Sequence, residues 1–210
     1  MQQNRKPALV QFHREGIIDA AMRLFTERGL DETTMGDIAQ EAGYSKSTMY
    51  VYFSSKDEIS SAVAARLMTQ MRQDLVKAVD PGLSFLEQYK VYSQYLIDLR
   101  DNEPYQFQVL TGALRFEGAL EGEAPWLHDA LSSAQDMFVV LQAFYQQGVD
   151  AGVLREEAGE GRSAMLMFCA MSGLVSMVSE SQFFLEFHLG ASRQEFLEYG
   201  LRMLLRMYEK

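Results

Sequence analysis

The chain has few of the residues that support covalently stapled or metal-stabilised folds. Its 210 residues include one cysteine, Cys169, and three histidines. A single cysteine excludes an internal disulfide framework and suits a reducing cytoplasm, where we expect the protein to be located. No histidines or cysteines have the close spacing of a metal site, so no metal is expected. The fold must therefore come from a buried apolar core, which a chain of this length can form.

Features of catalysis and of membrane insertion are also scarce. Cys169 has no histidine near it in sequence, which favours a small core residue over a nucleophile. Glycine-rich phosphate loops are absent, so we expect no nucleotide cofactor and no enzymatic activity. Residues 1–7 are polar and basic, unlike a secretory signal. The least polar stretch, residues 163–179, is shorter than the ~20 residues that span a bilayer, so we expect a helix buried on both sides and no membrane partner.

Positive charge is in deficit. The 19 basic residues are outnumbered by 29 acidic ones, for a net charge of −10. Up to Lys56, seven basic residues balance seven acidic ones, which leaves 12 basic and 22 acidic residues for the remainder. The acidity therefore lies outside the N-terminal segment. A neutral N-terminal segment that binds a nucleic acid must depend on short-range contacts and on dimerisation, because long-range steering is weak.

Helix boundaries are concentrated in residues 33–58. Thr34 is a favourable N-cap, and Asp37 three residues later supplies the acidic half of a capping box. Apolar residues then recur at helical spacing as far as Gly43, where a helix would end with positive φ. A short helix followed by a tight turn is expected here.

A second short helix is expected after this turn. Ser45 would cap it, and Met49 and Phe53, four residues apart, would form its buried side. A third helix would begin at Ser55, with Glu58 completing a Ser-x-x-Glu box. Two short helices joined by a turn containing glycine are typical of the helix-turn-helix motif, whose second helix enters the DNA major groove.

The side chains left outside the second helix favour double-stranded DNA as a partner. Short hydroxyls suit phosphate oxygens or base edges, and tyrosine hydroxyls reach phosphates without charge. Lys56 would stand in the first turn of the next helix, where the dipole disfavours a cation; an external anion or simple solvation would each account for it. The predicted DNA contacts are Ser45, Lys46, Ser47 and Thr48 on the bases and nearby phosphates, and Thr34, Tyr50, Tyr52 and Lys56 on the backbone.

The run from Ile17 to Ile59 resembles the DNA-binding domain of the tetracycline-repressor (TetR) family. Many positions match at fixed spacing: Ile17, Ile18, Ala21, Leu24, Phe25, Gly29, Thr33, Thr34, Ile38, Ala39, Ala42, Gly43, Ser45, Thr48, Tyr50, Phe53 and Lys56. Tyr44 departs from the pattern, because the family more often has a small aliphatic residue there. The resemblance implies an all-α protein: a helix-turn-helix domain with an N-terminal arm (residues 1–54) and a larger helical ligand-binding and dimerisation domain (residues 55–210).

Helical periodicity continues through the rest of the chain. Residues 1–12 are expected to form a partly disordered arm, residues 117–125 a loop, and residues 100–102 a helix break. No segment alternates with period two between hairpin turns, so no sheet is expected. The further helices are expected at residues 13–28, 55–79, 83–99, from Pro104, and at 126–151, 161–181 and 191–208.

The last two expected helices predict a homodimer interface. The final helix is apolar along two faces, more than one protomer's core can cover, and exposed patches of that size mark interfaces. The resemblance implies the same, with two C-terminal helices from each protomer forming a four-helix interface. The predicted interface residues are Met171, Val175, Phe196, Gly200, Met203 and Met207.

The resemblance also implies a regulatory pocket within the C-terminal helices. The chain has 13 methionines and 13 phenylalanines, and methionine lines adaptable binding surfaces. Most such residues at helical spacing are nevertheless plain core. The predicted pocket residues are Tyr89, Tyr92, Phe107, Trp126 and Tyr145.

Together these features predict a homodimeric transcriptional repressor that leaves a palindromic operator when a small hydrophobic effector binds. Two alternatives remain open. One is a constitutive DNA-binding or interaction module of the same fold without a ligand. The other is an activator, which differs only in where its DNA site lies relative to a promoter.

Overall fold

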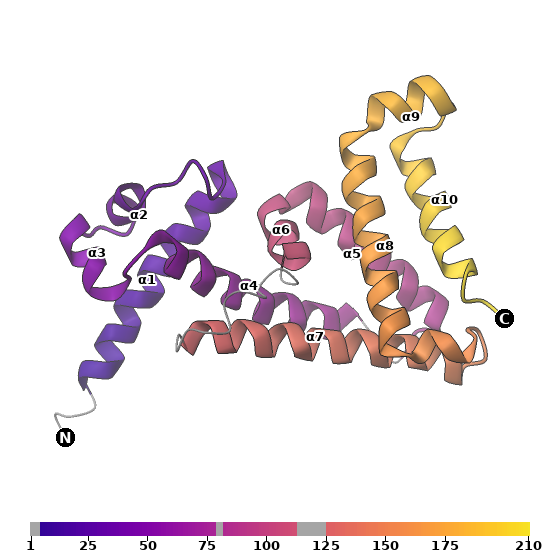
Figure 1. Cartoon of the computed structure of the whole chain (residues 1–210), viewed down its shortest axis with the longest axis horizontal. Coiled ribbons are helices and arrows are strands. Elements are labelled where there is room, and N and C mark those ends of the chain that lie inside the picture. Colours follow the sequence, from indigo (N-terminus) through magenta and orange to yellow (C-terminus); the bar gives the residue numbers. More distant parts are fainter. Residues whose placement is uncertain (1–4, 79–81, 113–124) are drawn as a thin grey trace.

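The computed structural model describes residues 5–78, 82–112 and 125–210, and the side chains of residues 8–77, 82–112, 132–181 and 183–210. The described residues are almost entirely helical, with no strand among them beyond one isolated bridge, which confirms the all-α class (Figure 1). The helices are α1 (Arg5–Arg28), α2 (Met35–Glu41), α3 (Lys46–Tyr52), α4 (Lys56–Ala78), α5 (Phe85–Asn102), α6 (Pro104–Gly112), α7 (Pro125–Asp150), the 3-10 turn η2 (Glu156–Gly159), α8 (Gly161–Glu180), α9 (Gln182–Leu189) and α10 (Arg193–Arg206).

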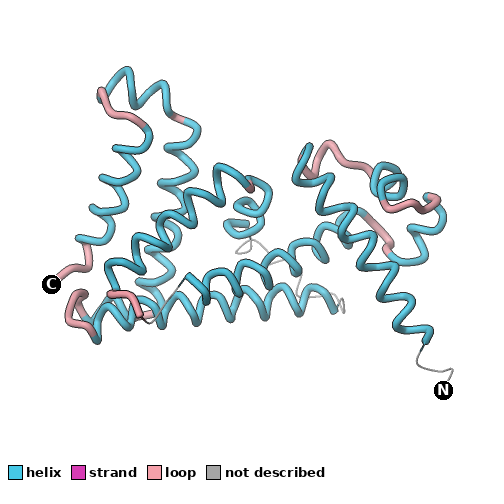
Figure 2. Tube along the Cα trace, turned by 180° about the vertical axis from the view of Figure 1, so that it is seen from behind, coloured by secondary structure: helices cyan, strands magenta, loops and turns pink. Residues whose placement is uncertain are grey.

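Two groups of helices are joined by α4. Helices α1 to α3, called the head below, lie at one end of the molecule, and α5 to α10, called the body, lie at the other (Figures 1 and 2). The expected boundary between residues 54 and 55 falls just before α4. The second half of α4 lies side by side with α7, and α8 to α10 stand as a hairpin across the far end of the body.

Helix α4 packs in both groups. Its first half lies against α1, where Arg66 forms ion pairs with Glu15 and Asp19. Farther along, Thr69 is hydrogen-bonded to Ser133 of α7 at 3.0 Å. The apolar stripe of α4 is buried throughout: Ile59, Val63, Leu67, Met71 and Leu75.

Three helices begin with reciprocal capping boxes, in which a hydroxyl accepts from the N3 amide and the N3 carboxylate accepts from the cap amide. These are Thr34 with Asp37 at α2, Ser84 with Glu87 at α5, and Ser192 with Glu195 at α10. Such boxes satisfy amide groups that a helix N-terminus otherwise leaves unpaired. The hydrogen bonds from Ser84 and Ser192 hold the pKa of Glu87 and Glu195 below its usual value.

Several expected boundaries are wrong. Residues 5–12 are helical and extend α1, because Pro7 falls in the first turn, where its missing N–H costs no hydrogen bond. Residues 100–102 do not break α5: Arg100 pairs with Glu180 and Asp101 with Arg193, and the helix ends only before Pro104. The expected loop at 117–125 lies, but for Pro125, outside the described residues.

The expected helix at residues 163–179 is present as α8, but it is not buried on both sides. One face is enclosed, while Leu166 and Met177 on the other are 54% and 64% exposed. Cys169 lies on this second face and is exposed, so its assignment as a core residue is wrong. In the described part of the chain, α8 alone is long and apolar enough to cross a membrane, a test that an amphipathic core helix also passes.

The chain after α7 returns to close the body. Gly148 permits a close approach, because a Cβ there would stand 2.7 Å from Leu154 and 2.9 Å from Phe85. Gly152, with φ of +74°, ends the helix. Leu154 then forms an antiparallel bridge to Glu209 near the C-terminus.

Gly148→Ala is expected to lower the free energy of unfolding by about 1–3 kcal/mol, because the added methyl overlaps two packed side chains. The control is Gly16→Ala in α1, where a Cβ meets no heavy atom within 4 Å. This control should raise the free energy of unfolding by about 0.5–1 kcal/mol, since alanine favours the helix. Urea unfolding of both variants tests the pair, and equal effects would contradict the packing argument.

Candidate DNA-binding surface and ligand cavity

Local hydrogen bonds define the start of α2. Thr34 Oγ1 donates to Asp37 Oδ2 at 2.7 Å, and the Asp37 amide donates back at 3.2 Å. The hydrogen bonds that the Asp37 carboxylate accepts from the Thr34 hydroxyl and amide, with the nearby Arg28 guanidinium, hold the pKa of Asp37 below its usual value. The Thr34 hydroxyl is thus occupied and stands beside a carboxylate, a poor environment for a phosphate. Its predicted role on the DNA backbone remains a prediction.

The turn between α2 and α3 contains a contact that accounts for Tyr44. Gly43 has φ of +75°, the left-handed conformation expected there. The Tyr44 hydroxyl lies 2.6 Å from His13 Nδ1 of α1, and the Tyr52 ring packs against the same imidazole. An aromatic residue in the turn therefore ties the motif to α1.

Arg14 fixes the end of α3. Its guanidinium donates to the Tyr52 carbonyl, pairs with Glu58 of α4 at 3.3 Å and stacks over the Phe53 ring at 4.0 Å. Met49 and Phe53 are buried, as predicted. Residues of α1, α3 and α4 thus meet at one side chain, which restrains α3 relative to α4.

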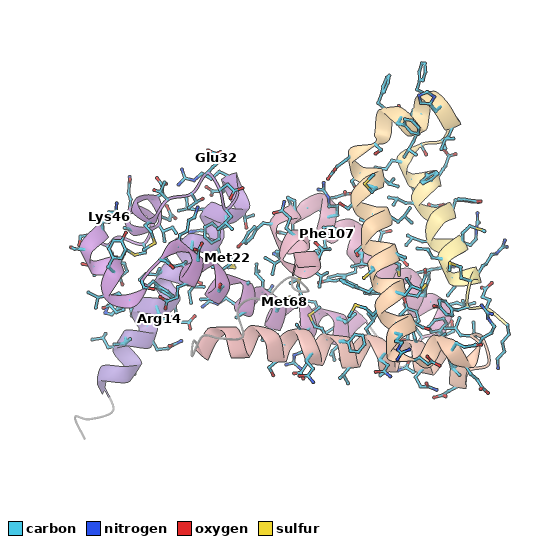
Figure 3. All side chains as sticks on the ribbon, viewed as in Figure 1. Arg14, Met22, Glu32, Lys46, Met68 and Phe107 are labelled. Atoms are coloured by element: carbon cyan, nitrogen blue, oxygen red, sulfur yellow. The ribbon has the colours of Figure 1, made fainter. Side chains whose placement is uncertain are left out.

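The outer face of α3 is solvent-exposed and carries no acid. Ser45 caps the helix, accepting from the Thr48 amide at 3.1 Å, and its hydroxyl also contacts those of Ser47 and Thr48. Lys46 lies at the outer end of the head (Figure 3). Tyr50 is 52% exposed. The predicted residues Ser45, Lys46, Ser47, Thr48 and Tyr50 thus form one continuous surface.

Val51 is a surface residue that sequence analysis missed. Its side chain is 76% exposed, one of the largest values for an apolar residue in the described part of the chain. The signal was available, because a helix with Met49 and Phe53 inward turns residue 51 outward.

The remaining predicted backbone contacts have internal partners. Lys56 Nζ donates to the Leu30 carbonyl at 2.9 Å, which accounts for a lysine in the first turn of α4 without an external anion. An ammonium has three donors, so the contact leaves room for a phosphate. Tyr52 is half-buried against His13.

The capping box predicted at Ser55 is only half formed. The Glu58 amide donates to Ser55 Oγ at 3.1 Å, as expected. The Glu58 carboxylate, however, accepts from the amide and hydroxyl of Ser54, one residue earlier, and also pairs with Arg14. The acid therefore joins the α3–α4 connection instead of closing the box.

An apolar cavity lies in the body between α4, α5, α6, α7 and α8. The centre of a water molecule could move through about 70 Å³ of it. Three methionines in the wall are flexible enough to change its size. The wall is formed by Met68, Leu75, Tyr92, Tyr95, Leu96, Leu110, Ala134, Met137, Phe138, Leu141, Met165 and Phe168.

Of the predicted pocket residues, Tyr92 lines this cavity. Tyr89, Phe107 and Tyr145 are buried outside its wall: the Tyr89 hydroxyl donates to the Leu201 carbonyl at 2.8 Å, and that of Tyr145 contacts the Met171 sulfur. The side chain of Trp126 lies outside the described residues. Periodicity identified buried aromatics but not which of them border empty space.

Tyr95 is one of two tyrosines in the cavity wall. Its hydroxyl is buried and has no hydrogen-bond partner among the described residues. Burial, with a smaller contribution from the Asp74 carboxylate, raises the pKa of Tyr95 to about 12, so the phenol stays protonated at neutral pH. A buried donor without a partner is costly, and a ligand with one acceptor would relieve that cost.

Two walls of the cavity also touch the head. Met68 and Leu75 belong to α4, whose Arg66 pairs with two acids of α1. Leu110 belongs to α6, whose Tyr105 ring lies 5.5 Å from that of Phe25 in α1. A change in cavity size would therefore act on α1 through two contacts.

The predicted interface is wrong at several positions. Met171 and Val175 are fully enclosed by their own protomer, and Gly200 faces Leu174 of α8 across the α8–α10 contact. Phe196 is half-buried. Only Met203 and Met207 are exposed as expected, at 39% and 53%.

The apolar face of α8 that is exposed is the opposite one. It carries Leu166, Cys169, Gly173 and Met177, spaced three or four residues apart. Tyr199 and Met203 of α10, which packs against α8, and Met207 just after it are exposed apolar residues as well. Sequence analysis expected this helix to be buried on both sides and so did not distinguish the face that turns inward.

The fold and the exposed α3 define a helix-turn-helix protein with a larger helical body. Residues 17–63 match the model of the family described as bacterial regulatory proteins, tetR family. The uncharacterised regulator YvdT of Bacillus subtilis is 42% identical over 55 residues, which cover 26% of this chain and 28% of that protein. The nicotine-responsive repressor HdnoR of Paenarthrobacter nicotinovorans is 36% identical over 67 residues, or 32% and 34% of the two chains.

The body is matched by structure. The triclosan complex of SmeT, a repressor of a multidrug efflux pump of Stenotrophomonas maltophilia, is similar with a TM-score of 0.62 and 22% identity over 94% of this chain and 92% of that one. At this identity the likeness concerns the fold. The sequence matches to YvdT and HdnoR span about a third of the length of those proteins. Residues 17–63 are thus a DNA-binding domain of the TetR family, and the whole chain has the fold of solved helix-turn-helix proteins of this kind.

Tyr95→Phe and Tyr89→Phe should change stability in opposite directions. Removing the unpartnered Tyr95 hydroxyl should raise the free energy of unfolding by up to about 1 kcal/mol, whereas removing that of Tyr89 should lower it by about 1 kcal/mol. Denaturant unfolding at pH 7 measures both. Equal losses in the two variants would show that the Tyr95 hydroxyl has a partner.

Proposed function

We propose that the protein is a cytoplasmic, homodimeric repressor that binds a palindromic operator and is released by a small hydrophobic effector. The observation that carries the proposal is the outer face of α3. It presents hydroxyls, Lys46 and Tyr50 to solvent, while Arg14 and Tyr44 hold the helix from behind. In a helix-turn-helix protein this is the face that enters the major groove.

The α3 side chains divide by chemistry. Ser47 and Thr48 reach base edges, and the exposed Val51 offers an apolar contact for a thymine methyl group. Lys46, Tyr50, Tyr52 and Lys56 reach phosphates, which set orientation and carry no sequence information. The Ser45 hydroxyl mainly serves the helix cap. A short reading helix contacts few bases, so two protomers are needed for a specific site.

The dimer would use the exposed apolar surface of α8 and α10. Cys169 and Gly173 are small, which allows two copies of α8 to approach closely across a two-fold axis. The two copies of α3 would then face the same side of the dimer and read two half-sites about one helical turn apart.

The effector would occupy the cavity of the body. Drug-sized ligands need roughly 300 Å³ or more, so binding has to enlarge the present space by moving the methionines. The wall favours an uncharged, largely apolar molecule with one acceptor for the Tyr95 hydroxyl. HdnoR is a nicotine-responsive repressor, and SmeT forms a complex with triclosan. Both support a small molecule as the class of effector.

Enlargement of the cavity would shift α4 and α6, and both contact α1. The separation of the two reading helices would then change. A ligand shifts this equilibrium only as far as it binds one state more tightly than the other. A difference in binding free energy of about 5.5 kcal/mol would raise the fraction of protein in the released state from 1% to 99%.

A constitutive module without a ligand remains the second candidate, favoured by the small size of the cavity. An activator would use the same surfaces.

Lys56→Ala should weaken binding to all DNA sequences and lower the salt slope of the dimer by about two, one phosphate per protomer. Lys77→Ala on the far end of α4 is the control. Fluorescence anisotropy at several salt concentrations measures the dependence of DNA affinity on salt. An unchanged slope would show that Lys56 contacts no phosphate and serves only the hydrogen bond to the Leu30 carbonyl.

Thr48→Ala is expected to relax sequence preference at one position of each half-site, by about 1–3 kcal/mol of discrimination. Binding to a set of single-base operator variants measures it. A uniform loss for every variant would instead place the residue on the phosphate backbone.

A further inference from the structure

Helix α9 exposes an aromatic cluster that the proposed repressor mechanism does not use. Phe183, Phe184 and Phe187 are 79%, 56% and 72% exposed, and Leu189 is 56% exposed. The rings of Phe183 and Phe187 stack on each other at 5.7 Å. Side chains of α9 project beyond the end of the α8–α10 hairpin, away from the rest of the body (Figure 3).

The cluster is held in place. Leu185 is buried and anchors α9 to its own protomer. Before α9, Glu180 pairs with Arg100 of α5 at 3.2 Å; after it, Arg193 pairs with Asp101 of α5 at 2.6 Å. These contacts fix the two chain segments that flank α9 against α5 and leave the three rings exposed.

The cluster is continuous with the surface proposed for dimerisation. Met177 is the last exposed apolar residue of α8, two turns before Phe184, and α10 returns from α9 beside α8. Fully buried aromatic side chains each remove about 150–250 Å² from water, so the three exposed rings represent on the order of 400 Å². A stable interface needs about 800 Å² per partner, so the cluster would supply roughly half.

We propose that the aromatic cluster of α9 packs onto the α8–α10 hairpin of a second copy of this chain and extends the dimer interface. The inference rests on the proposed homodimer and goes beyond it by assigning part of its stability to α9. In a two-fold interface each protomer contributes the same patch, so each ring removed is lost twice.

The test compares the double variant Phe183→Ser/Phe187→Ser with Phe12→Ser. Phe12 is 70% exposed and belongs to α1, a helix that lies far from α9 (Figure 1), so it controls for the loss of an exposed ring. Sedimentation velocity over a range of concentrations gives the dimer dissociation constant, and far-UV circular dichroism checks helix content. The single variant Phe187→Ser repeats the test with less change to α9.

The double variant should raise the dissociation constant at least tenfold with unchanged helix content, and Phe12→Ser should leave it unchanged. If the dissociation constant of the double variant stayed within twofold of that of the parent protein, the proposed role of α9 would be overturned, whereas the proposed homodimer would not. A parent protein that stays monomeric, with no cross-linking of Cys169 by a bis-maleimide, would overturn both. Binding of the parent protein, but not the variant, to phosphatidylglycerol vesicles would instead identify α9 as a membrane-contacting surface and overturn the inference.

Discussion

One continuous helix belongs to both parts of this protein, and this constraint governs the rest of the structure. Ile59 near the start of α4 is buried beside the head, and Leu75 near its end borders the cavity of the body. Because the hydrogen-bonded backbone of a helix transmits displacement along its axis, a shift of α4 at the cavity would also displace α4 where it packs against the head. Arg14 strengthens this connection by joining α1, α3 and the first turn of α4.

The connection between cavity and head has a second branch through α6. Leu110 lines the cavity and Tyr105 contacts Phe25 of α1, so this nine-residue helix touches both the cavity and the head. The cavity is small and its wall is rich in methionine, which suits a site that opens as the ligand enters. The buried, unpartnered hydroxyl of Tyr95 would give selection among apolar ligands a physical basis.

Helix caps could be predicted from the sequence, but which apolar face of a helix is buried could not. The caps at Thr34 and Ser45 were predicted because they depend on residues within three positions of each other. Met171 and Val175 were misplaced because α8 is apolar on two faces, and only packing decides which one turns inward. Helix α9 was missed because its aromatic residues follow no single buried face. Tyr44 departs from the family pattern, and its partner His13 is 31 residues away, beyond the reach of local rules.

The most direct test of the central claim is selection of bound duplexes from a random DNA pool by the purified protein. The account predicts enrichment of a palindrome whose half-sites lie about one helical turn apart. If the folded protein, stripped of any co-purified ligand and assayed at low salt, enriched no sequence, the outer face of α3 would not be a DNA-reading surface and the account would be wrong.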